Sequence, residues 1–126
     1  MHAKILLDTN FILVPAQFKV DIYAEINRVC PSTCELYVLD KSLQELDNII
    51  KTSKGRQKAA ARLAKAIFEA KKPKTLKTTS KDYVDDIILG LDGYIVATND
   101  KVLRSQLKKK GVTTITLRQK NHLVLE

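Results

Sequence analysis

The sequence predicts an α/β fold with a central, mostly parallel sheet of about four or five strands, flanked by helices in three layers. Short continuous apolar runs alternate with longer segments whose apolar residues recur every three or four positions, and this alternation is typical of parallel strands joined by helices. The length of 126 residues and the hydrophobic content of 44% suit a single domain, residues 1–126, with its own core.

The strands are predicted where apolar residues follow one another without a polar residue between them. Such runs are typical of strands buried on both faces of a sheet. The last predicted strand is weaker and alternates apolar with polar residues, as half-buried strands do. The four predicted strands cover residues 5–7, 36–39, 94–97 and 112–117.

Helices are predicted where the apolar residues would form one stripe along a helix. These segments cover residues 20–29, 43–50, 57–71, 83–91 and 102–109. The lysine-rich stretch 71–81 is interpreted as a loop with one short edge strand, and not as a linker between domains. Only about 45 residues follow it, with one convincing core strand among them.

The charge balance favours a polyanionic partner. The chain has 22 Lys and Arg against 14 Asp and Glu, a formal net charge of +8. Nucleic acid suits this charge better than an acidic protein does, although a solvated lysine-rich surface gives the same composition.

No run reaches the roughly 18 apolar residues of a membrane span, and Asp8 interrupts the first apolar run too early for a signal peptide. We therefore expect a soluble cytoplasmic protein without a membrane partner.

Cys30 and Cys34 are the two cysteines of the chain. They are too few and too close together for a disulfide framework or for a complete zinc site. We therefore expect both to be free, partly buried thiols.

Four carboxylates occur where two strands end and two helices begin. Asp8 follows the first strand, and Asp100 follows the strand at 94–97. Glu45 and Asp85 lie near the starts of two helices. In an open parallel sheet, sites form beyond the carboxyl ends of the strands where the strand order reverses, so these acids would converge if the two strands are neighbours. Carboxylates are ligands that Mg²⁺ and Mn²⁺ prefer, so the pattern predicts a divalent-metal site.

Each acid also has a purely structural explanation. Asp8 could bind the N–H of Asn10 in a turn, and Asp100 could cap the helix that follows it. The segments Ser42-Leu-Gln-Glu45 and Asp82-Tyr-Val-Asp85 resemble capping boxes. Four such positions together favour a shared site. Because acids this close would repel one another, we expect raised carboxylate pKa values and stabilisation by metal.

Asp85 is a better ligand than its neighbour Asp86. On a helix that buries Val84, Ile87 and Ile88, Asp85 falls at the border of the buried stripe and Asp86 nearly opposite it. Asp86 is then either a ligand of a second ion or a solvent-exposed residue.

Four motifs resemble, in order along the chain, those of the PIN-domain nucleases. They are Leu7-Asp-Thr-Asn-Phe11, Val38-Leu-Asp-Lys-Ser-Leu-Gln-Glu-Leu46, Tyr83-Val-Asp-Asp-Ile-Ile88 and Ile95-Val-Ala-Thr-Asn-Asp100. Within that family, the chain is most similar to archaeal relatives of the PIN nuclease that acts in small-subunit ribosomal RNA processing, with the VapC-type toxins as the second choice. The resemblance implies the three-layer PIN-like fold.

The resemblance also implies a site and a reaction. The implied catalytic residues, which would hold one or two Mg²⁺ or Mn²⁺ ions, are Asp8, Glu45, Asp85 and Asp100. Asn10 and Thr98 would support them, and a metal-activated water would hydrolyse RNA phosphodiester bonds. Homodimers are frequent in the family. Residues 123–125 and 59–66 are candidate contacts, with a place in the core as the alternative for both. An antitoxin or a ribosome-assembly protein is a candidate partner.

Seven basic residues follow the acidic positions and are candidates for contacts with RNA phosphates on either side of the cut. They are Lys51, Lys54, Arg56, Lys58, Lys101, Arg104 and Lys108. The alternative for each is a solvated helix face. Aromatic residues for base stacking are sparse and the chain has no Trp, so specificity is expected from RNA shape or from a partner.

Three functions are compatible with these patterns. The preferred one is a metal-dependent endoribonuclease, for ribosomal RNA processing or as a toxin. The second is a non-catalytic RNA-binding scaffold, in which the acids only cap helices. The third is a phosphatase or response-regulator-like domain, which would need a phosphoacceptor Asp and a partner lysine after a later strand, where this chain has Thr98-Asn-Asp100.

Overall fold

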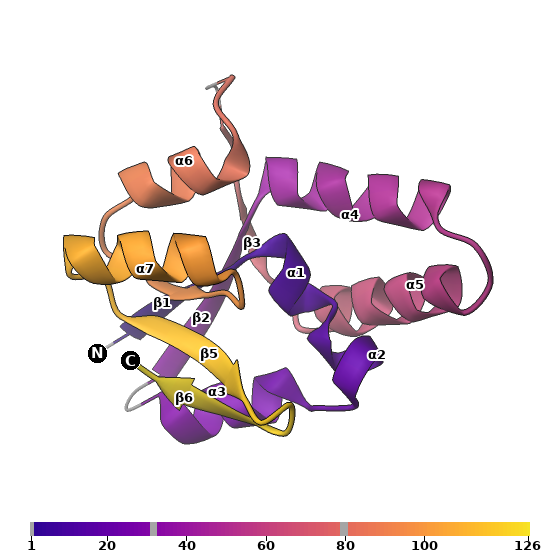
Figure 1. Cartoon of the computed structure of the whole chain (residues 1–126), viewed down its shortest axis with the longest axis horizontal. Coiled ribbons are helices and arrows are strands. Elements are labelled where there is room, and N and C mark those ends of the chain that lie inside the picture. The colour runs from indigo at the N-terminus through magenta and orange to yellow at the C-terminus, as the bar shows by residue number, and fades with distance from the viewer. Residues whose placement is uncertain (1, 31–32, 79–80) are drawn as a thin grey trace.

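The alternation of strands and helices predicted from the sequence is present in the structure (Figure 1). The computed structural model describes residues 2–30, 33–78 and 81–126. Within these residues, six strands form one sheet in the order β3-β2-β1-β4-β5-β6. The strands are β1 (His2–Leu7), β2 (Thr33–Leu39), β3 (Lys74–Leu76), β4 (Ile95–Ala97), β5 (Thr114–Arg118) and β6 (His122–Leu125). Every neighbouring pair is parallel except β5 with β6, which confirms a mostly parallel sheet with more strands than expected.

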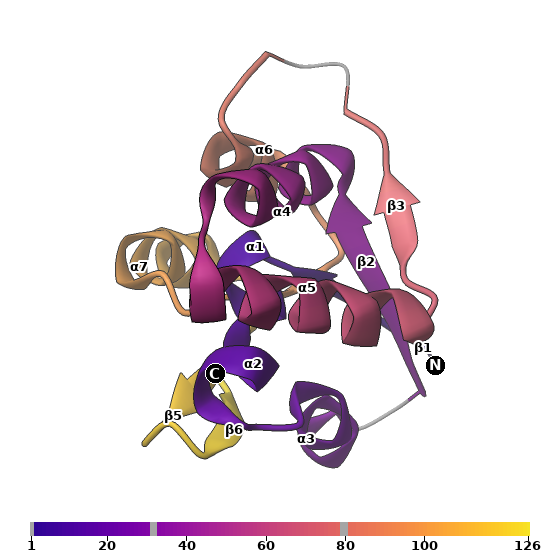
Figure 2. The ribbon, with the colours of Figure 1, turned by 90° about the vertical axis from the view of Figure 1, so that its right-hand side faces the viewer.

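The helices confirm the predicted segments and add two short ones at the start of the chain. They are α1 (Thr9–Ile12), α2 (Val14–Phe18), α3 (Ile22–Val29), α4 (Asp40–Thr52), α5 (Gly55–Ala70), α6 (Val84–Gly90) and α7 (Lys101–Lys110). Figure 2 shows α4 and α5 as an antiparallel pair and β2 beside β3. Strand β3 is the edge strand expected in the lysine-rich stretch, of which Thr79 and Ser80 lie outside the described residues. No helix in the described part of the chain has the length and apolar character needed to cross a bilayer.

Helices α1 and α2 lack the periodic pattern from which helices are predicted. The residues from Phe11 to Val14 are all buried, so no polar face marks them as helical. Local signals define their ends instead. The side chain of Asp8 accepts a hydrogen bond from the N–H of Thr9 at the start of α1, and Lys19 ends α2 in the left-handed conformation with φ of 56°.

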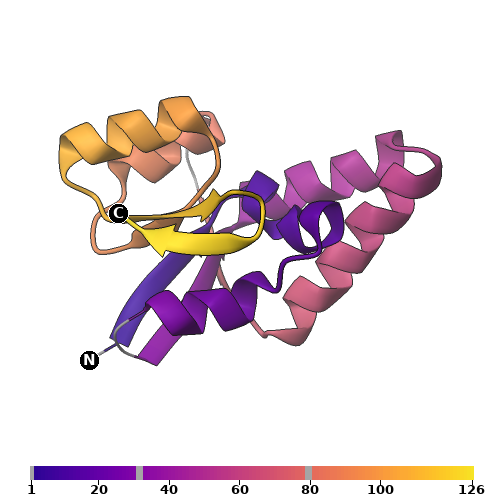
Figure 3. The ribbon, with the colours of Figure 1, turned by 60° about the horizontal axis from the view of Figure 1, so that its bottom comes forward.

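Helices cover both faces of the sheet, and β1 contributes to two cores. Ile5 and Leu7 face the core formed with α1 to α5, whereas Leu6 faces a second core that contains Ile88 of α6 and Leu103 of α7. All three β1 residues are fully buried, which explains why this run is continuously apolar. Figure 3 shows α6 and α7 together on one side of the sheet, away from α3 and α5.

The strand order reverses at β1, which lies between β2 and β4. The chain passes from β1 to β2 and β3 in one direction, then returns to β4 on the other side of β1. At the carboxyl ends of this pair, the N–H of Asp8 donates to the carbonyl oxygen of Ala97 over 3.0 Å. The two strands that precede Asp8 and Asp100 are therefore neighbours, as the predicted site requires.

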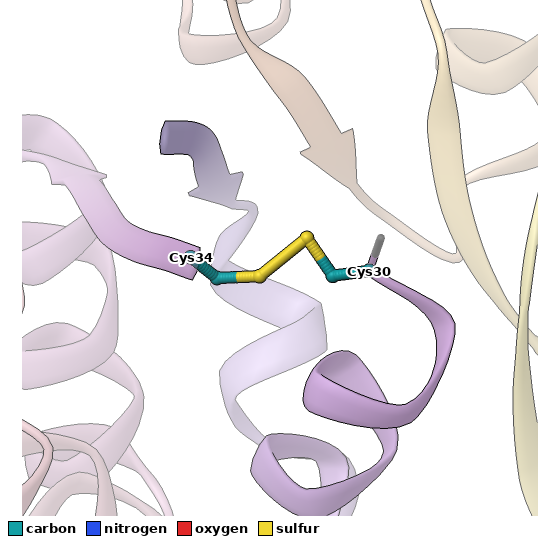
Figure 4. Close-up of a disulfide and its surroundings, with 2 residues drawn as sticks. All are labelled: Cys30 and Cys34. Atoms are coloured by element: carbon teal, nitrogen blue, oxygen red, sulfur yellow. A yellow bond between two sulfur atoms is a disulfide. The ribbon is translucent and has the colours of Figure 1, made fainter. Parts of the chain in front are cut away.

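The expectation of free cysteines is wrong. A disulfide joins Cys30 at the end of α3 to Cys34 in β2 (Figure 4), and the Cα atoms of the two residues are 7.0 Å apart. The helix stops at Cys30, whose backbone is extended, and the described chain resumes with β2. The spacing of the cysteines in the sequence does not reveal that the end of α3 and the start of β2 bring their sulfur atoms together.

The residues suggested as dimer contacts are only partly taken up by the core, since Leu63 and Leu125 are 56% and 40% exposed and three others are buried. Leu123 of β6 and Ala61 and Ala64 of α5 are buried within one chain. The apolar character of these three residues is explained without a second subunit, and a homodimer stays a prediction.

The outer edge of β6 is covered by an ion pair from α3. Glu25 and Arg28 bind each other at 2.8 Å, and both also bind the backbone of Leu123. Glu25 accepts from the N–H of Leu123 at 3.0 Å, and Arg28 donates to its carbonyl oxygen at 2.8 Å. These backbone groups point away from β5, because Leu123 is paired with Leu117 at a position without ladder hydrogen bonds. Side chains thus replace a neighbouring strand at this edge.

Replacing Glu25 by Ala is expected to lower the free energy of unfolding by about 1–2 kcal/mol at neutral pH, because the Leu123 N–H and Arg28 lose their acceptor. The hydrogen bonds from Arg28 and Leu123 lower the pKa of Glu25 from 4.5 to about 2. A folded-state pKa below the unfolded-state value stabilises the fold above pH 4.5, and this contribution is lost as the pH falls towards 2. Urea denaturation of both proteins at neutral and acidic pH measures the difference.

Glu69→Ala is the matched control, because the Glu69 side chain is 61% exposed and lies 3.7 Å from Lys65 in a surface pair. It should leave the free energy of unfolding nearly unchanged. An equal loss for Glu25→Ala at neutral and acidic pH would show that packing, and not the charged carboxylate, stabilises this edge.

Candidate functional site

A hollow of about 700 Å³ opens beyond the carboxyl ends of β1 and β4, and all four predicted acids line it. Asp8 follows β1, Glu45 lies on α4, Asp85 lies in the first turn of α6, and Asp100 precedes α7. Figure 1 shows that α4, α6 and α7 all begin near α1, at this end of the sheet. The other residues that line the hollow are Thr9, Asn10, Lys41, Gln44, Asn48, Asp82, Tyr83 and Val84.

Asp8 is the buried acid of the hollow, with 5% of its surface exposed. Its Oδ1 accepts a hydrogen bond from the N–H of Thr9 at 2.9 Å, and its Oδ2 accepts one from the hydroxyl of Thr98 at 2.8 Å. The structural explanation predicted a bond from the N–H of Asn10, and the bond comes from Thr9 instead. Asp8 therefore caps α1 and faces the hollow at the same time.

Thr98 connects Asp8 to Asp100. The buried Thr98 hydroxyl donates to Asp8 and accepts from the N–H of Asp100 at 3.1 Å. Asp100 itself caps α7, because its Oδ1 accepts from the N–H groups of Val102 and Leu103 at 2.9 and 3.0 Å. The capping role predicted for Asp100 is thus confirmed. Both bonds use one carboxylate oxygen, so capping is compatible with a second role in the hollow.

Glu45 does not belong to a capping box. Helix α4 begins at Asp40, its N-cap is Leu39, and no side chain of the described residues caps it. Ser42 consequently lies inside the first turn, and the capping explanation for Ser42 and Glu45 is wrong. Later in the helix, Glu45 reaches the wall of the hollow as an exposed side chain.

The capping explanation is also wrong for the segment from Asp82 to Asp85. Tyr83 is the N-cap of α6, and among the described residues no side chain caps this helix. Asp85 occupies the first turn and lines the hollow, whereas the exposed Asp86 does not line it. This placement is compatible with the predicted preference for Asp85 over Asp86 as a ligand. The charge of Asp86 still raises the pKa of Asp85 from outside the hollow.

The pKa of Asp8 reflects burial first, then two hydrogen bonds that act against burial, and the neighbouring acids last. Burial raises the pKa of Asp8 above 3.8, and the negative charges of Asp85 and Asp100 raise it further. The hydrogen bonds from Thr98 and Thr9 act in the opposite direction without cancelling the rise. The charged form of Asp8 is therefore disfavoured in the folded protein.

Glu45 and Asp85 show the same effect. Partial burial and the charges of Asp8 and Asp85 raise the pKa of Glu45. The nearby Thr9 hydroxyl acts in the opposite direction, although it does not reach hydrogen-bond geometry. Burial and the charges of Asp100 and Asp86 raise the pKa of Asp85. The expected rise in carboxylate pKa is thus confirmed for Asp8, Glu45 and Asp85.

The donor atoms of the hollow fit a hard divalent cation. Carboxylate, amide and hydroxyl oxygens line it, which is the donor set of Mg²⁺ and Mn²⁺. In residues 2–30, 33–78 and 81–126, no three His, Cys, Asp or Glu side chains are grouped closely enough to enclose an ion by themselves. Mg²⁺ commonly keeps several waters and takes one or two carboxylates together with substrate phosphates. A partly hydrated ion therefore suits this arrangement, and the buried Asp8 would gain most from it.

Sequence patterns missed a polar stripe on α4 and an aromatic residue before α6. Lys41, Gln44 and Asn48 join Glu45 on the wall of the hollow. Their spacing of three or four residues places them on one helix face, and this periodicity in polar residues was the available signal. Tyr83 lines the hollow from the loop that precedes α6, a position that no periodic pattern marks.

The basic residues suggested as RNA contacts lie outside the hollow, since none of the seven is among the described residues that line it. Lys51 borders a separate depression beside Asp47 and Glu69. The charges of Arg104 and Lys108 act on Glu126 at the end of the chain. Contact of these seven residues with RNA stays a prediction.

Comparison with known proteins gives consistent matches. A family model described as a PIN like domain matches residues 5–120. Ribonuclease VapC4 of Methanocaldococcus jannaschii is 33% identical over 125 residues, which span 94% of this chain and 93% of that protein. The structure of the PIN domain endonuclease Utp24 has a TM-score of 0.76 at 26% identity and covers 98% of this chain and 90% of its own. A domain of a functionally unknown protein from M. jannaschii shares the fold, with a TM-score of 0.59 at 13% identity over 92% of this chain and 91% of its own.

Asp8→Asn is expected to stabilise the protein in the presence of EDTA at neutral pH, because it removes a buried charge and its repulsion by Asp85 and Asp100. We expect about 1 kcal/mol, or a rise in Tm of about 4 °C for a domain of this size. Thermal melting in EDTA measures it. Asp92→Asn is the control, since the Asp92 side chain is 90% exposed. A lower Tm for Asp8→Asn would show that the hydrogen bonds from Thr9 and Thr98 outweigh the cost of burial.

Proposed function

The chain belongs to the PIN-like domain family, and on this basis we propose that it is a divalent-metal-dependent endoribonuclease whose active site is the hollow beyond β1 and β4. The observation that carries this proposal is the meeting of four acids from separate segments in one hollow: Asp8, Glu45, Asp85 and Asp100. Capping does not explain Glu45 or Asp85, so a scaffold whose acids only cap helices is disfavoured.

The residues of the hollow would divide the work between holding the cation and placing the RNA. Asp8, Glu45, Asp85 and Asp100 would hold Mg²⁺ or Mn²⁺, which supplies Lewis acidity and lowers the pKa of water when it is bound. Thr98 fixes the orientation of the Asp8 carboxylate through its hydrogen bond. Asn10 and Asn48 offer amide groups to the sugar and the phosphate at the rim.

Lys41 offers the positive charge nearest to the proposed reaction. Among the described residues that line the hollow, it is the single Lys or Arg. Its ammonium group donates to the carbonyl oxygen of Asp82 over 2.8 Å, which keeps it at the edge of the hollow. A phosphate bound between the acids and Lys41 would be attracted from one side, which offsets its repulsion by the carboxylates.

Two finer functions remain as proposals. Similarity to the PIN domain endonuclease Utp24 at 26% identity supports endonuclease activity, and the motifs are the ground for a role in ribosomal RNA processing. Identity of 33% with Ribonuclease VapC4 supports a toxin that an antitoxin inhibits. The third function considered, a phosphatase-like domain, has no lysine after β4 in the required position, because Thr98 and Asn99 occupy it.

Asp8→Asn is expected to reduce RNA cleavage by more than about 100-fold in the presence of Mn²⁺ while RNA affinity is retained, because the carboxylate would hold the cation and not the RNA. Gel analysis of a labelled RNA measures the rate, and binding is measured with the same RNA in EDTA. Asp92→Asn should cleave at the wild-type rate. A wild-type protein that binds RNA but stays inert with Mn²⁺ and Mg²⁺ would support the scaffold instead.

Mn²⁺ is expected to raise the Tm of the wild-type protein, because the cation binds the folded state and removes the repulsion between the acids. At a concentration of about 100 times Kd, the gain is about 2.7 kcal/mol. Asp8→Asn and Glu45→Gln should reduce the shift. The absence of a shift in the wild-type protein would contradict the metal site.

Expression of the inactive Asp8→Asn variant in the native host separates the two finer functions. A processing nuclease should accumulate precursors of small-subunit ribosomal RNA when the inactive form competes with the active one. A toxin should leave these precursors unchanged, and expression of the wild-type protein should arrest growth unless a small antitoxin encoded beside it is present.

A further inference from the structure

Tyr83 is an exposed aromatic residue at the wall of the hollow. Its surface is 84% exposed, whereas Tyr23 and Tyr37 are 5% and 8% exposed and belong to the cores. Removing so exposed a ring should cost the fold little, since it buries almost no surface. It stands two residues before Asp85, in the segment that brings this acid to the hollow.

The backbone of Tyr83 is fixed although its ring is exposed. Its carbonyl oxygen accepts from the N–H of Ile87 at 3.0 Å as the N-cap of α6. The preceding carbonyl, that of Asp82, accepts from the ammonium of Lys41 at 2.8 Å. These bonds to α4 and α6 fix the backbone that carries the ring at the hollow, so the placement of this backbone does not depend on packing of the ring itself.

A second anchor lies a few residues earlier in the same segment. The carboxylate of Asp40 accepts from the hydroxyl of Thr78 at 2.8 Å and from its N–H at 3.1 Å. Asp40 and Lys41 are the first residues of α4, the helix that carries Glu45. The start of α4 thus holds the segment that leads to Tyr83 at two points.

The two walls of the hollow offer different chemistry to a ligand. The wall formed by α4 presents the amides of Gln44 and Asn48, which can donate and accept hydrogen bonds. Tyr83 lines the same hollow from the start of α6, together with the four acids. A flat aromatic group fits the Tyr83 side, and hydrogen-bonding groups such as ribose hydroxyls fit the α4 side. A nucleotide combines both kinds of group.

We propose that Tyr83 stacks against a nucleobase adjacent to the phosphate at the acids and so positions an unpaired nucleotide of the RNA in the hollow. This inference rests on the proposed ribonuclease function. Bases within a duplex already stack on their neighbours, so an unpaired nucleotide has the free face that Tyr83 requires. Stacking on one aromatic ring tolerates any base, so the residue selects unpaired structure and not sequence.

Binding is tested without cleavage. The chain contains no Trp, so Tyr83→Trp in an Asp8→Asn background gives a protein with one Trp at the proposed platform. Single-stranded oligoadenylate is expected to quench its fluorescence strongly, and a blunt RNA duplex of the same length only weakly. Phe18→Trp in the same background is the control, because Phe18 is 37% exposed at the end of α2, outside the hollow. Equal quenching of the Tyr83→Trp protein by single strand and duplex would overturn the proposal.

Cleavage tests the role of the ring in the otherwise unaltered protein. Tyr83→Ala is expected to raise KM for a single-stranded RNA about 10-fold, the effect of losing one base–aromatic stack, with a smaller change in kcat. Tyr83→Phe keeps the ring and should behave as the wild-type protein does. An unchanged KM in Tyr83→Ala, or an equal rise in Tyr83→Phe, would overturn the proposal.

The two experiments separate failure of this inference from failure of the proposed function. If the wild-type protein cleaves RNA but the Tyr83→Trp protein shows no selective quenching, the stacking proposal is wrong and the ribonuclease proposal stands. If quenching is selective but no RNA is cleaved with Mn²⁺ or Mg²⁺, Tyr83 still binds unpaired bases and the chain is a single-strand-binding scaffold.

Discussion

The pairing of β1 with β4 is the constraint on which the proposed site depends. It joins two segments far apart in the chain, and the bond from the N–H of Asp8 to Ala97 fixes their carboxyl ends side by side. Thr98 then connects Asp8 with the backbone of Asp100. Helices α4, α6 and α7 begin around this point, because each follows a strand or a loop that ends at the same edge of the sheet.

This arrangement opposes stability locally. The fold places Asp8 in a buried position and surrounds it with further acids, although the chain as a whole carries a net charge of +8. The raised pKa values of Asp8, Glu45 and Asp85 show that their charged forms are destabilised in the folded protein. Carboxylates with perturbed pKa values commonly mark functional sites. The cost is tolerated because the apolar runs of β1, β2 and β4 bury a core on each face of the sheet.

Local patterns predicted two kinds of element: helices with one polar and one apolar face, and strands that are apolar throughout. The five longer helices have a polar and an apolar side, and the runs at β1, β2 and β4 are continuously apolar, so both kinds were recognised. Residues 11–14 are buried all round, and β6 is a short edge strand whose outer backbone is covered by Glu25 and Arg28. Neither feature leaves a periodic signal. The disulfide between Cys30 and Cys34 depends on the placement of the end of α3 beside the start of β2, which residue spacing does not encode.

The sequence by itself determined the fold class, because strand ends and helix starts carry local signals. It also proposed the four acids, because strand ends and helix starts of a parallel sheet share one edge. It also favoured Asp85 over Asp86, since the helical period alone separates their directions. Only the tertiary structure decided that Lys41, Gln44 and Tyr83 share the hollow with the acids and that the seven suggested basic residues do not line it. Proximity across a sheet edge follows from strand order and from the packing of helices, and these properties belong to the whole chain rather than to any segment of it.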